Sequence, residues 1–332
     1  MISPMPESFD LPWDCQEPKL KTFRAIELSQ IAIRETKWAV EQLVPEGLSV
    51  LASPPKSGKS FFVLQMGIAV ASGEPFLNLE TSQGKVLYCA LEDSLERIRS
   101  RLNALFKEQS NLPESLYIFV DDLPRLDDGG ISVLGEWIGF YDPRLVILDT
   151  WGRVKPANKT RGENAYEADV RIVSEVKRLA DRHECSILLV HHLRKGGSRD
   201  ADWLESLSGS MGLGGTADGI LSLVRDRGSK QAILKRSGRD FEEEDDMALE
   251  WLSPGWKYSG NPEDLKMSAE RKAIVALIAE AGEPVPCSFV AQVLGKNFHT
   301  TKSLIRKMAR AGILRSTSKG EYSLASDYEF HP

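Results

Sequence analysis

The sequence predicts an α/β protein with a mostly parallel sheet, followed by a small C-terminal domain of three helices and a hairpin. Short apolar runs alternate with helical stretches between residues 46 and 252, which is typical of a parallel sheet covered by helices on both faces. The length of 332 residues exceeds what one core usually organises, so a second, smaller domain is expected. A linker rich in Ser, Pro and Gly, residues 253–265, separates the two parts.

The composition is that of an ordinary globular protein. Hydrophobic residues make up 42% and charged residues 27%, which excludes global disorder. A net charge of -6 excludes a chain-wide basic surface, so any DNA site must be local. Cys15, Cys89, Cys185 and Cys287 show no CxxC spacing, which excludes a clustered zinc site and favours the reducing cytosol over a disulfide scaffold. The longest uncharged run, residues 61–73, is too short to span a bilayer, so we expect a cytoplasmic protein without a membrane partner.

The elements follow in order along the chain. We expect residues 1–45 to form an N-terminal arm, because a Pro-rich, weakly patterned tail leads into one short amphipathic stretch. Between residues 46 and 252, the expected parallel strands are LSVLA, KVLYCAL, LYIFV, RLVILDT, SILLVHH and GILSLV. Residues 60–72 are almost wholly apolar and predict a buried helix, whereas residues 94–107 and 165–183 predict helices with one charged face. LSLVRD, KQAILKR and MALEWL predict antiparallel strands that finish the sheet.

The C-terminal domain, residues 266–332, has the pattern of a winged helix-turn-helix. Helices are expected over residues 268–281, 286–294 and 300–311. The segment ILRSTSKGEYSLA then alternates about a Lys-Gly turn, which predicts a hairpin. This domain carries a net charge of +4, which leaves -10 for the rest of the chain.

A phosphate-binding loop is the most specific motif. The strand LSVLA runs directly into SPPKSGKS, residues 53–60, and then into the buried helix, which is the context that a P-loop requires. Such a loop turns backbone N–H groups and a helix N-terminus toward phosphates, while Lys59 reaches the β- and γ-phosphates and Ser60 binds Mg²⁺. Ser53 stands where Gly is usual, and an accidental Gly-Lys-Ser at a helix start is the alternative interpretation. The expected ATP contacts are Ser53, Pro54, Pro55, Lys56, Ser57, Gly58, Lys59, Ser60 and Phe61.

Two acidic residues at strand ends complete the expected chemistry. Asp149 ends a buried strand and is the candidate to hold the magnesium shell together with Ser60, with helix capping as its alternative. Glu92 follows the strand after the P-loop helix and is our candidate to activate the attacking water. Its neighbour Asp93 is better explained as a cap of the helix that begins near Ser94, although the same interpretation stays open for Glu92.

A histidine pair closes the strand SILLV. His191 or His192 is placed to hydrogen-bond the γ-phosphate and to report its loss to the next loop, whereas a structural histidine at a strand end is the alternative. The following segment, residues 193–213, is rich in Gly and Ser and predicts a mobile basic loop or a plain connection. Its candidate DNA-binding residues are Arg194, Lys195 and Arg199.

The ordered motifs PPKSGKS, VLYCALEDS, RLVILDTWGRV, LLVHHLRKG, SGSMGLGGTADGILSLVRD and LKRSGRD resemble those of the plasmid RepA-type hexameric helicases, within the broader RecA-like ATPases. The resemblance covers roughly residues 35–252. It implies a RecA-like P-loop core that assembles into a homo-hexameric ring, binds ATP and Mg²⁺ between subunits, and holds single-stranded DNA by loops in its channel.

The resemblance also implies a basic residue that reaches the γ-phosphate of the adjacent subunit. Lys235, Arg236 and Arg239 all stand in the strand region that would supply it, and we favour Arg239 and Lys235 over surface charges of no function. The departures are the missing N-terminal helical domain of the larger ring helicases and the added winged helix.

The winged helix offers a second candidate DNA surface. Its third helix carries Thr300 and Thr301 beside three basic residues, and the wing carries Arg315 and Lys319. Docking of a protein and simple stabilisation are the alternatives. The basic residues expected to contact duplex DNA from the third helix are Lys302, Arg306 and Lys307.

Two functional hypotheses follow. The first is an ATP-hydrolysing helicase-type motor that acts on single-stranded DNA in the replication of a plasmid, phage or mobile element. The second is a DNA-binding regulator or assembly factor that uses ATP as a switch and does not unwind DNA. Stimulation of ATP hydrolysis by single-stranded DNA separates them.

Overall fold

The computed structural model describes residues 22–32, 35–106, 112–156, 163–193, 213–226, 228–241, 246–260, 262–310, 312–317 and 320–325. The chain divides between Thr36 and Lys37 into two compact units. The described part of the first unit contains the short helix α1 (Ala25–Leu28). None of the described helices combines the length and the hydrophobicity that a bilayer-spanning segment needs.

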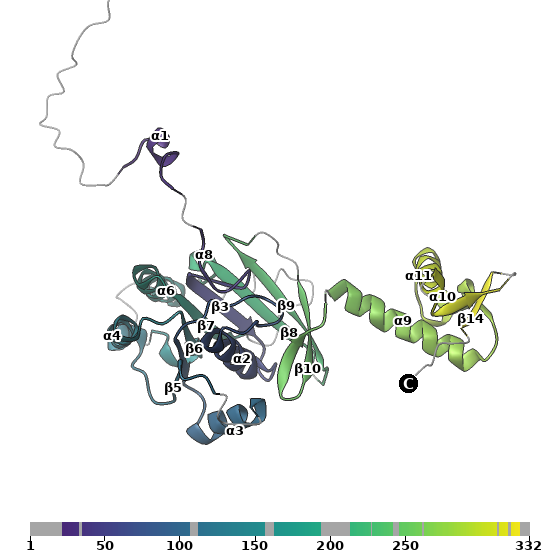
Figure 1. The fold of residues 1–332 in the computed structure, drawn as a ribbon, viewed down its shortest axis with the longest axis horizontal. Helices are drawn as coiled ribbons and strands as arrows, with labels where there is room; N and C mark the ends of the chain where they lie inside the picture. Colours follow the sequence, from purple (N-terminus) through teal and green to yellow (C-terminus); the bar gives the residue numbers. More distant parts are fainter. Residues whose placement is uncertain are drawn as a thin grey trace, which may run out of the picture. The chain divides into compact units, whose positions relative to one another are not determined.

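A nine-stranded sheet organises the second unit (Figure 1). Its strands are β3 (Gly47–Ser53), β4 (Val86–Ala90), β5 (Leu116–Phe119), β6 (Leu145–Asp149), β7 (Ser186–His192), β8 (Gly219–Arg225), β9 (Gln231–Gly238), β10 (Met247–Leu252) and β11 (Gly255–Tyr258). They lie in the order β11-β10-β9-β8-β3-β7-β6-β4-β5, in which β8 to β5 are parallel and β9, β10 and β11 extend the sheet antiparallel. The loop-bearing strand β3 is therefore central, with the acid-bearing strands β6 and β4 beyond β7. This is the α/β fold class with a mostly parallel sheet that the sequence predicts, and that prediction is confirmed.

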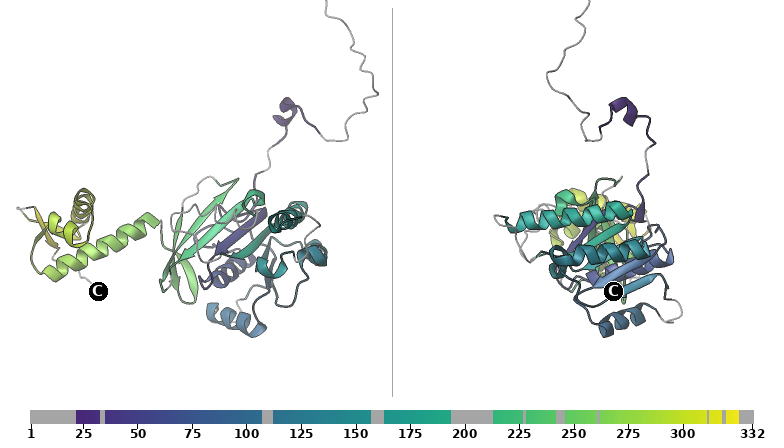
Figure 2. Two further views of the ribbon diagram at one scale, coloured as in Figure 1. Left: turned by 180° about the vertical axis from the view of Figure 1, so that it is seen from behind. Right: turned by 90° about the vertical axis from the view of Figure 1, so that its left-hand side faces the viewer.

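Helices cover both faces of the sheet (Figure 2). They are α2 (Lys59–Ser72), α3 (Leu95–Leu105), η2 (Leu126–Gly130), α4 (Ile131–Tyr141), α5 (Trp151–Val154), α6 (Ala165–His183) and α8 (Leu213–Thr216). Every residue of β3 is buried, and its side chains alternate between two apolar clusters, with Leu51 on the α2 side and Val50 on the side of α4 and α6.

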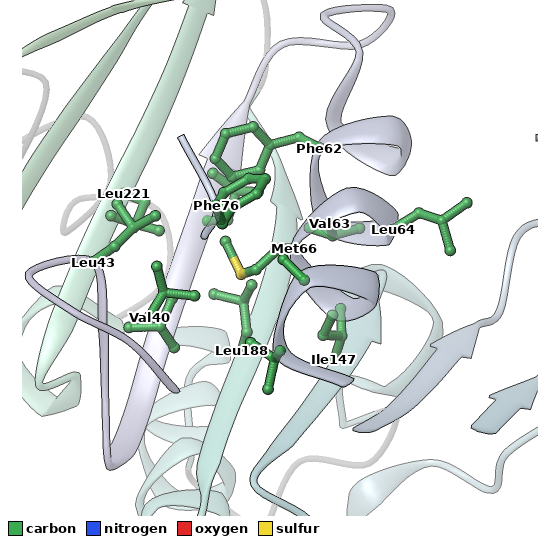
Figure 3. Close-up of a cluster of buried hydrophobic side chains, with 14 of the residues drawn as sticks. Val40, Leu43, Phe62, Val63, Leu64, Met66, Phe76, Ile147, Leu188 and Leu221 are labelled. Carbon is green, nitrogen blue, oxygen red and sulfur yellow. The ribbon is translucent and has the colours of Figure 1, made fainter. Parts of the chain in front are cut away.

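Helix α2 fills the space on one face, as its nearly uncharged sequence predicts. Phe62, Val63 and Met66 point from α2 into a cluster that includes Leu188 and Ile147 of the sheet, and the Phe62 ring lies beside Phe76 (Figure 3). Gly73 ends the helix in a left-handed conformation, with φ of 74°, which suits a residue without a Cβ atom.

Residues 37–45, which the sequence assigns to the arm, pack against this core. Strands β1 (Trp38–Val40) and β2 (Val44–Pro45) form a short antiparallel hairpin. Val40, Leu43 and Val44 are fully buried in the same cluster as α2. The apolar side chains at these positions give the hairpin its place in the core.

The region expected as a linker contains regular structure at both of its ends. Strand β11 pairs with β10, and Ser253 and Pro254 form the turn between them because Leu252 pairs with Gly255. Trp256 on β11 is 2% exposed, so this strand belongs to the core. Helix α9 (Pro262–Ala281) begins only three residues after Ser259.

The C-terminal part consists of helices and a small antiparallel sheet, as expected. Its further elements are β12 (Val285–Pro286), α10 (Cys287–Val293), α11 (Phe298–Arg310), β13 (Leu314–Ser316) and β14 (Glu321–Leu324). The three strands have the order β12-β14-β13. Ile274, Val290, Ile305 and Met308 form a core of their own between the helices and this sheet. Assignment of this part as a winged helix stays a prediction.

Candidate nucleotide-binding site

The loop between β3 and α2 has the geometry that a phosphate site needs. Gly58 adopts a left-handed conformation, with φ of 95°, and a Cβ atom there would stand 2.9 Å from the Trp256 ring. Gly58 also caps α2 without a side-chain hydrogen bond, which leaves the first N–H groups of this helix to a ligand. Ser53, in the position where Gly is usual, is the last residue of a regular strand, and its hydroxyl hydrogen-bonds with that of Ser57. The substitution therefore requires no strained backbone and adds a bond across the loop.

Lys59 lies over the loop and is 4% exposed. Its Nζ donates hydrogen bonds to the carbonyl oxygens of Ser53 and Pro54, each at 2.9 Å. Burial lowers the pKa of Lys59 to about 8, while the nearby carboxylates of Asp149 and Glu92 act in the opposite direction. The ammonium group is thus the positive charge of a largely desolvated site.

Asp149 and Ser60 lie together, as a magnesium site requires. Asp149 ends β6 and is 4% exposed, and burial raises the pKa of its carboxyl. Hydrogen bonds from the hydroxyls of Tyr88 and Ser60 oppose that rise. The Tyr88 hydroxyl donates to Asp149 Oδ2 at 3.0 Å. A hydroxyl and a carboxylate are hard oxygen ligands of the kind that Mg²⁺ prefers, so this pair fits the metal.

The adjacent acids Glu92 and Asp93 have different surroundings. Glu92 lies at the edge of the site with a half-exposed side chain, and Thr150 Oγ1 donates to its Oε1 at 2.8 Å. Asp93 is instead held by α3, where Arg97 contacts it at 2.9 Å and Arg101 forms a second ion pair. The structure therefore leaves Glu92 as the acid that faces the site, whereas Asp93 anchors α3.

The two histidines at the end of β7 also differ. His192 Nε2 lies 3.3 Å from Glu92 Oε2, so the second oxygen of this carboxylate is also in contact. Burial lowers the pKa of His191 to about 4, which keeps that ring neutral at physiological pH. The three candidate DNA-binding residues of the next loop lie outside the described residues.

A family model for the AAA domain matches residues 16–198, which is more than half of the chain. The chain belongs to the AAA domain family. AAA domains are P-loop ATPase domains, so the family supports ATP and Mg²⁺ as the ligands of the loop, the Ser60–Asp149 pair and Lys59.

Two solved structures are similar to parts of the chain. One is an ATPase domain that is 15% identical, with a TM-score of 0.48 over 62% of this chain and 81% of that one. The other is the RadB recombinase, which is 17% identical, with a TM-score of 0.46 over 65% of this chain and 91% of that one. No curated protein matches the chain.

The basic residues expected to act between subunits lie at the antiparallel side of the nine-stranded sheet, on β9 or just after it. Arg236 is 9% exposed and donates to the Gln42 carbonyl at 2.7 Å, which ties β9 to the N-terminal hairpin. Arg239 is more exposed and donates to the Gly215 carbonyl at 3.1 Å. Lys235 lies on β9 opposite Ser222 of β8. Arg236 and Arg239 thus both have contacts within their own chain, and Arg239 is the more exposed of the two, so the choice among the three residues stays a prediction.

Helix α11, beyond the AAA domain, presents the basic face that the sequence predicts, with one correction. Arg306 and Lys307 are exposed, and Lys302 packs over the Phe298 ring at 5.4 Å. Thr301 was expected to face DNA but is 1% exposed, because it lies on the helix face that Leu304 and Met308 turn into the core. Arg315 on β13 is exposed, and Lys319 lies outside the described residues.

Sequence reasoning missed three contributors to the site. Tyr88 and Thr150 contact the two carboxylates, and Trp256 donates through Nε1 to the Gly58 carbonyl at 3.2 Å. Thr150 directly follows Asp149, so its position was a usable signal. Tyr88 lies two residues before Ala90, the cross-strand partner of Asp149, but only the register of β4 and β6 reveals that neighbour. Nothing in the sequence near residue 256 indicates contact with a loop 198 residues earlier.

Proposed function

We propose that the chain is an ATP-hydrolysing DNA motor of the hexameric helicase type that its motifs resemble. It acts on single-stranded DNA in the replication of a plasmid, phage or mobile element, with ATP and Mg²⁺ bound at the subunit interfaces of a ring. Membership in the AAA domain family supports the ATPase. The contact between Glu92 and His192 is the observation that carries the link to DNA.

The residues at the carboxyl edge of the sheet divide the chemistry among them. Lys59 and the N-terminus of α2 bind the phosphates. Ser60 and Asp149 would hold a magnesium ion, which would supply positive charge to the phosphates. Glu92 orients and deprotonates the attacking water, because its carboxylate is half exposed at the edge of the loop. Lys235 and Arg239 complete the site of the neighbouring subunit.

The link to DNA runs through β7. His192 is the last residue of β7, and Arg194, Lys195 and Arg199 follow it in the sequence. Binding of DNA phosphates by those side chains would shift the end of β7, and the 3.3 Å contact passes that shift to Glu92. Hydrolysis is then faster on DNA than in its absence, which is the requirement for a motor.

The second candidate is the ATP-switched regulator, and the exposed basic face of α11 favours it. Arg306 and Lys307 point to solvent from a part of the chain whose net charge is +4, whereas the rest carries -10. Such a surface suits duplex phosphates. In this case ATP would control assembly, and single-stranded DNA would not change the hydrolysis rate.

The deciding experiment measures ATP hydrolysis with and without single-stranded DNA, together with strand separation, for the wild type, Glu92→Gln and Asp93→Asn. We expect stimulation by DNA in the wild type. Glu92→Gln should bind ATP but hydrolyse it at least ~100-fold more slowly, because water activation is lost. Asp93→Asn is the matched control and should keep most of the activity, because its carboxylate serves Arg97 and Arg101.

The outcomes separate the candidates. If single-stranded DNA does not change the rate of ATP hydrolysis and no strand separation is detected, the result would favour the ATP-switched regulator over the motor. Normal hydrolysis by Glu92→Gln combined with loss in Asp93→Asn would reverse the assignment of the two acids.

A further inference from the structure

Two buried hydroxyl groups contact the two carboxylates of the site. Tyr88 on β4 donates to Asp149 Oδ2 at 3.0 Å, and Thr150 donates to Glu92 Oε1 at 2.8 Å. The whole Tyr88 residue is 0% exposed, and Thr150 is 2% exposed. Neither hydroxyl belongs to the phosphate loop or to the expected set of ATP contacts.

The arrangement is reciprocal between two neighbouring strands. Strands β4 and β6 pair in parallel, with Ala90 opposite Asp149. Tyr88 belongs to β4, the strand that leads to Glu92, yet it holds the acid of β6. Thr150 follows β6, yet it holds the acid that follows β4. Each strand thus supplies the hydroxyl for the acid carried by the other, which fixes the two carboxylates relative to one another.

Packing alone does not explain these hydroxyls. A buried hydroxyl costs free energy unless it is hydrogen-bonded, and Phe and Val would fill nearly the same space as Tyr and Thr without that cost. The polar groups at positions 88 and 150 are satisfied by the carboxylates themselves. Their benefit therefore lies in the position of the acids.

We propose that Tyr88 and Thr150 are positioning residues for ATP hydrolysis, Tyr88 for the metal-holding Asp149 and Thr150 for the water-activating Glu92. This inference rests on the proposed function of the two acids. Glu92 depends on such a contact more than Asp149 does, because its side chain is half exposed and its other oxygen contacts His192 at 3.3 Å, whereas Asp149 is buried beside Ser60.

The two residues have different kinetic signatures. Thr150→Val should lower kcat about 10- to 100-fold at nearly unchanged KM, because the bound nucleotide keeps its contacts while the carboxylate loses its orientation. Tyr88→Phe should instead raise the Mg²⁺ concentration for half-maximal hydrolysis about 10-fold, because the metal-holding carboxylate loses its hydrogen bond. A merely structural role would move both readouts together.

The experiment measures kcat, KM for ATP and Mg²⁺ dependence in the full chain, with Thr150→Ser as the matched control that keeps the hydroxyl. Thr150→Ser should retain kcat within about 3-fold of the wild type. Adding Thr150→Val to Glu92→Gln should cause no further loss, because the hydroxyl then has no catalytic carboxylate to orient. Thermal unfolding verifies that each variant folds, and Thr150→Ala replaces Thr150→Val in the comparison with Thr150→Ser if Val does not fit.

Several results would overturn the inference. Equal activity of Thr150→Val and Thr150→Ser would show that the hydroxyl does not matter, and a further loss in the Glu92→Gln background would place its effect elsewhere. An unchanged Mg²⁺ dependence in Tyr88→Phe would overturn the role of Tyr88 in positioning Asp149. Failure of the proposed function is recognised separately, because Glu92→Gln alone would then hydrolyse ATP at the normal rate.

Discussion

Lys59 supplies a positive charge to the site, but its burial disfavours the charged form of the side chain. The residue is 4% exposed, and burial lowers its pKa to about 8. Asp149 and Glu92 favour its charged form but do not offset the burial. The ammonium is therefore mostly protonated at neutral pH and loses its proton over the range around pH 8.

The affinity for ATP should consequently fall as pH rises. The protonated lysine attracts phosphate and the neutral amine does not, so binding above pH 8 requires uptake of a proton and weakens by up to about 10-fold per pH unit. Calorimetric titration with ATP between pH 7 and pH 9.5 measures this dependence. Lys59→Arg is the control, because a guanidinium stays charged and should flatten the decline. An affinity that stays constant in the wild type would contradict the assigned role of Lys59.

The principal side chains of the candidate site could be proposed from the sequence because each stands at a place that a motif defines. Lys59 and Ser60 belong to the loop, Asp149 ends an apolar strand and Glu92 follows another, so the parallel sheet brings them to one edge. The position of Thr150 directly after Asp149 was a usable signal, but the hydrogen bonds that Tyr88 and Thr150 donate to the two carboxylates were not identifiable in this way. They depend on strand register and on side-chain rotamers, which local patterns do not encode.

Among the secondary-structure elements, the turn between β10 and β11 shows why turn-forming residues alone do not settle a prediction. Ser253 and Pro254 favour either a linker or a tight turn, and the sequence alone does not choose between them. Trp256 decides between a linker and a turn, because its ring packs beside Trp251 in the apolar cluster that contains α2 and so holds β11 against the sheet. The hairpin of β1 and β2 is likewise part of the core because its apolar side chains pack against residues far along the chain, in the same cluster as α2.

Strand β11 should stabilise both the fold and the loop. Gln65 on α2 accepts from the Trp256 backbone N–H at 2.8 Å, and the indole donates to Gly58. Trp256→Ala should therefore lower the free energy of unfolding by about 3–5 kcal/mol and weaken ATP binding. Urea denaturation and nucleotide titration measure the two effects. Lys257→Ala, an exposed change on the same strand, should leave both unchanged, and a similar loss in the two variants would argue against the specific contact.

At the scale of the whole molecule, the proposed ring requires sites shared between subunits. Lys59→Ala and Arg239→Ala should each abolish hydrolysis alone, the first by removing a phosphate contact and the second by removing the charge supplied to a neighbour. Mixed subunits should recover part of the activity, because some interfaces then combine an intact Lys59 with an intact Arg239. Hydrolysis by the mixture is the measurement, with mixed assembly confirmed by differently tagged subunits. No recovery would assign Arg239 to its own subunit.

The C-terminal part should bind duplex DNA by itself. Its separate apolar core predicts that residues 262–332 fold alone, and the exposed Arg306 and Lys307 predict phosphate contacts. Binding of labelled duplex should weaken steeply as salt increases, because phosphate contacts release counterions. Charge reversal at both residues should weaken binding further, whereas Lys272→Glu on α9 serves as the control. Equal loss in the control, or binding insensitive to salt, would favour a protein-docking role.

The hydrogen bond between Trp256 and Gly58 has a consequence for folding during synthesis, because it forms only after both residues have been translated. It joins residues 198 apart, and β3, which precedes the loop, needs β7 and β8 as neighbours before it is buried. The phosphate loop leaves the ribosome early, whereas the strands that support it, β7, β8 and β11, leave it late. The apolar helix α2 is therefore exposed in the nascent chain for most of translation. The earliest functional motif in the sequence is thus among the last to reach its working shape.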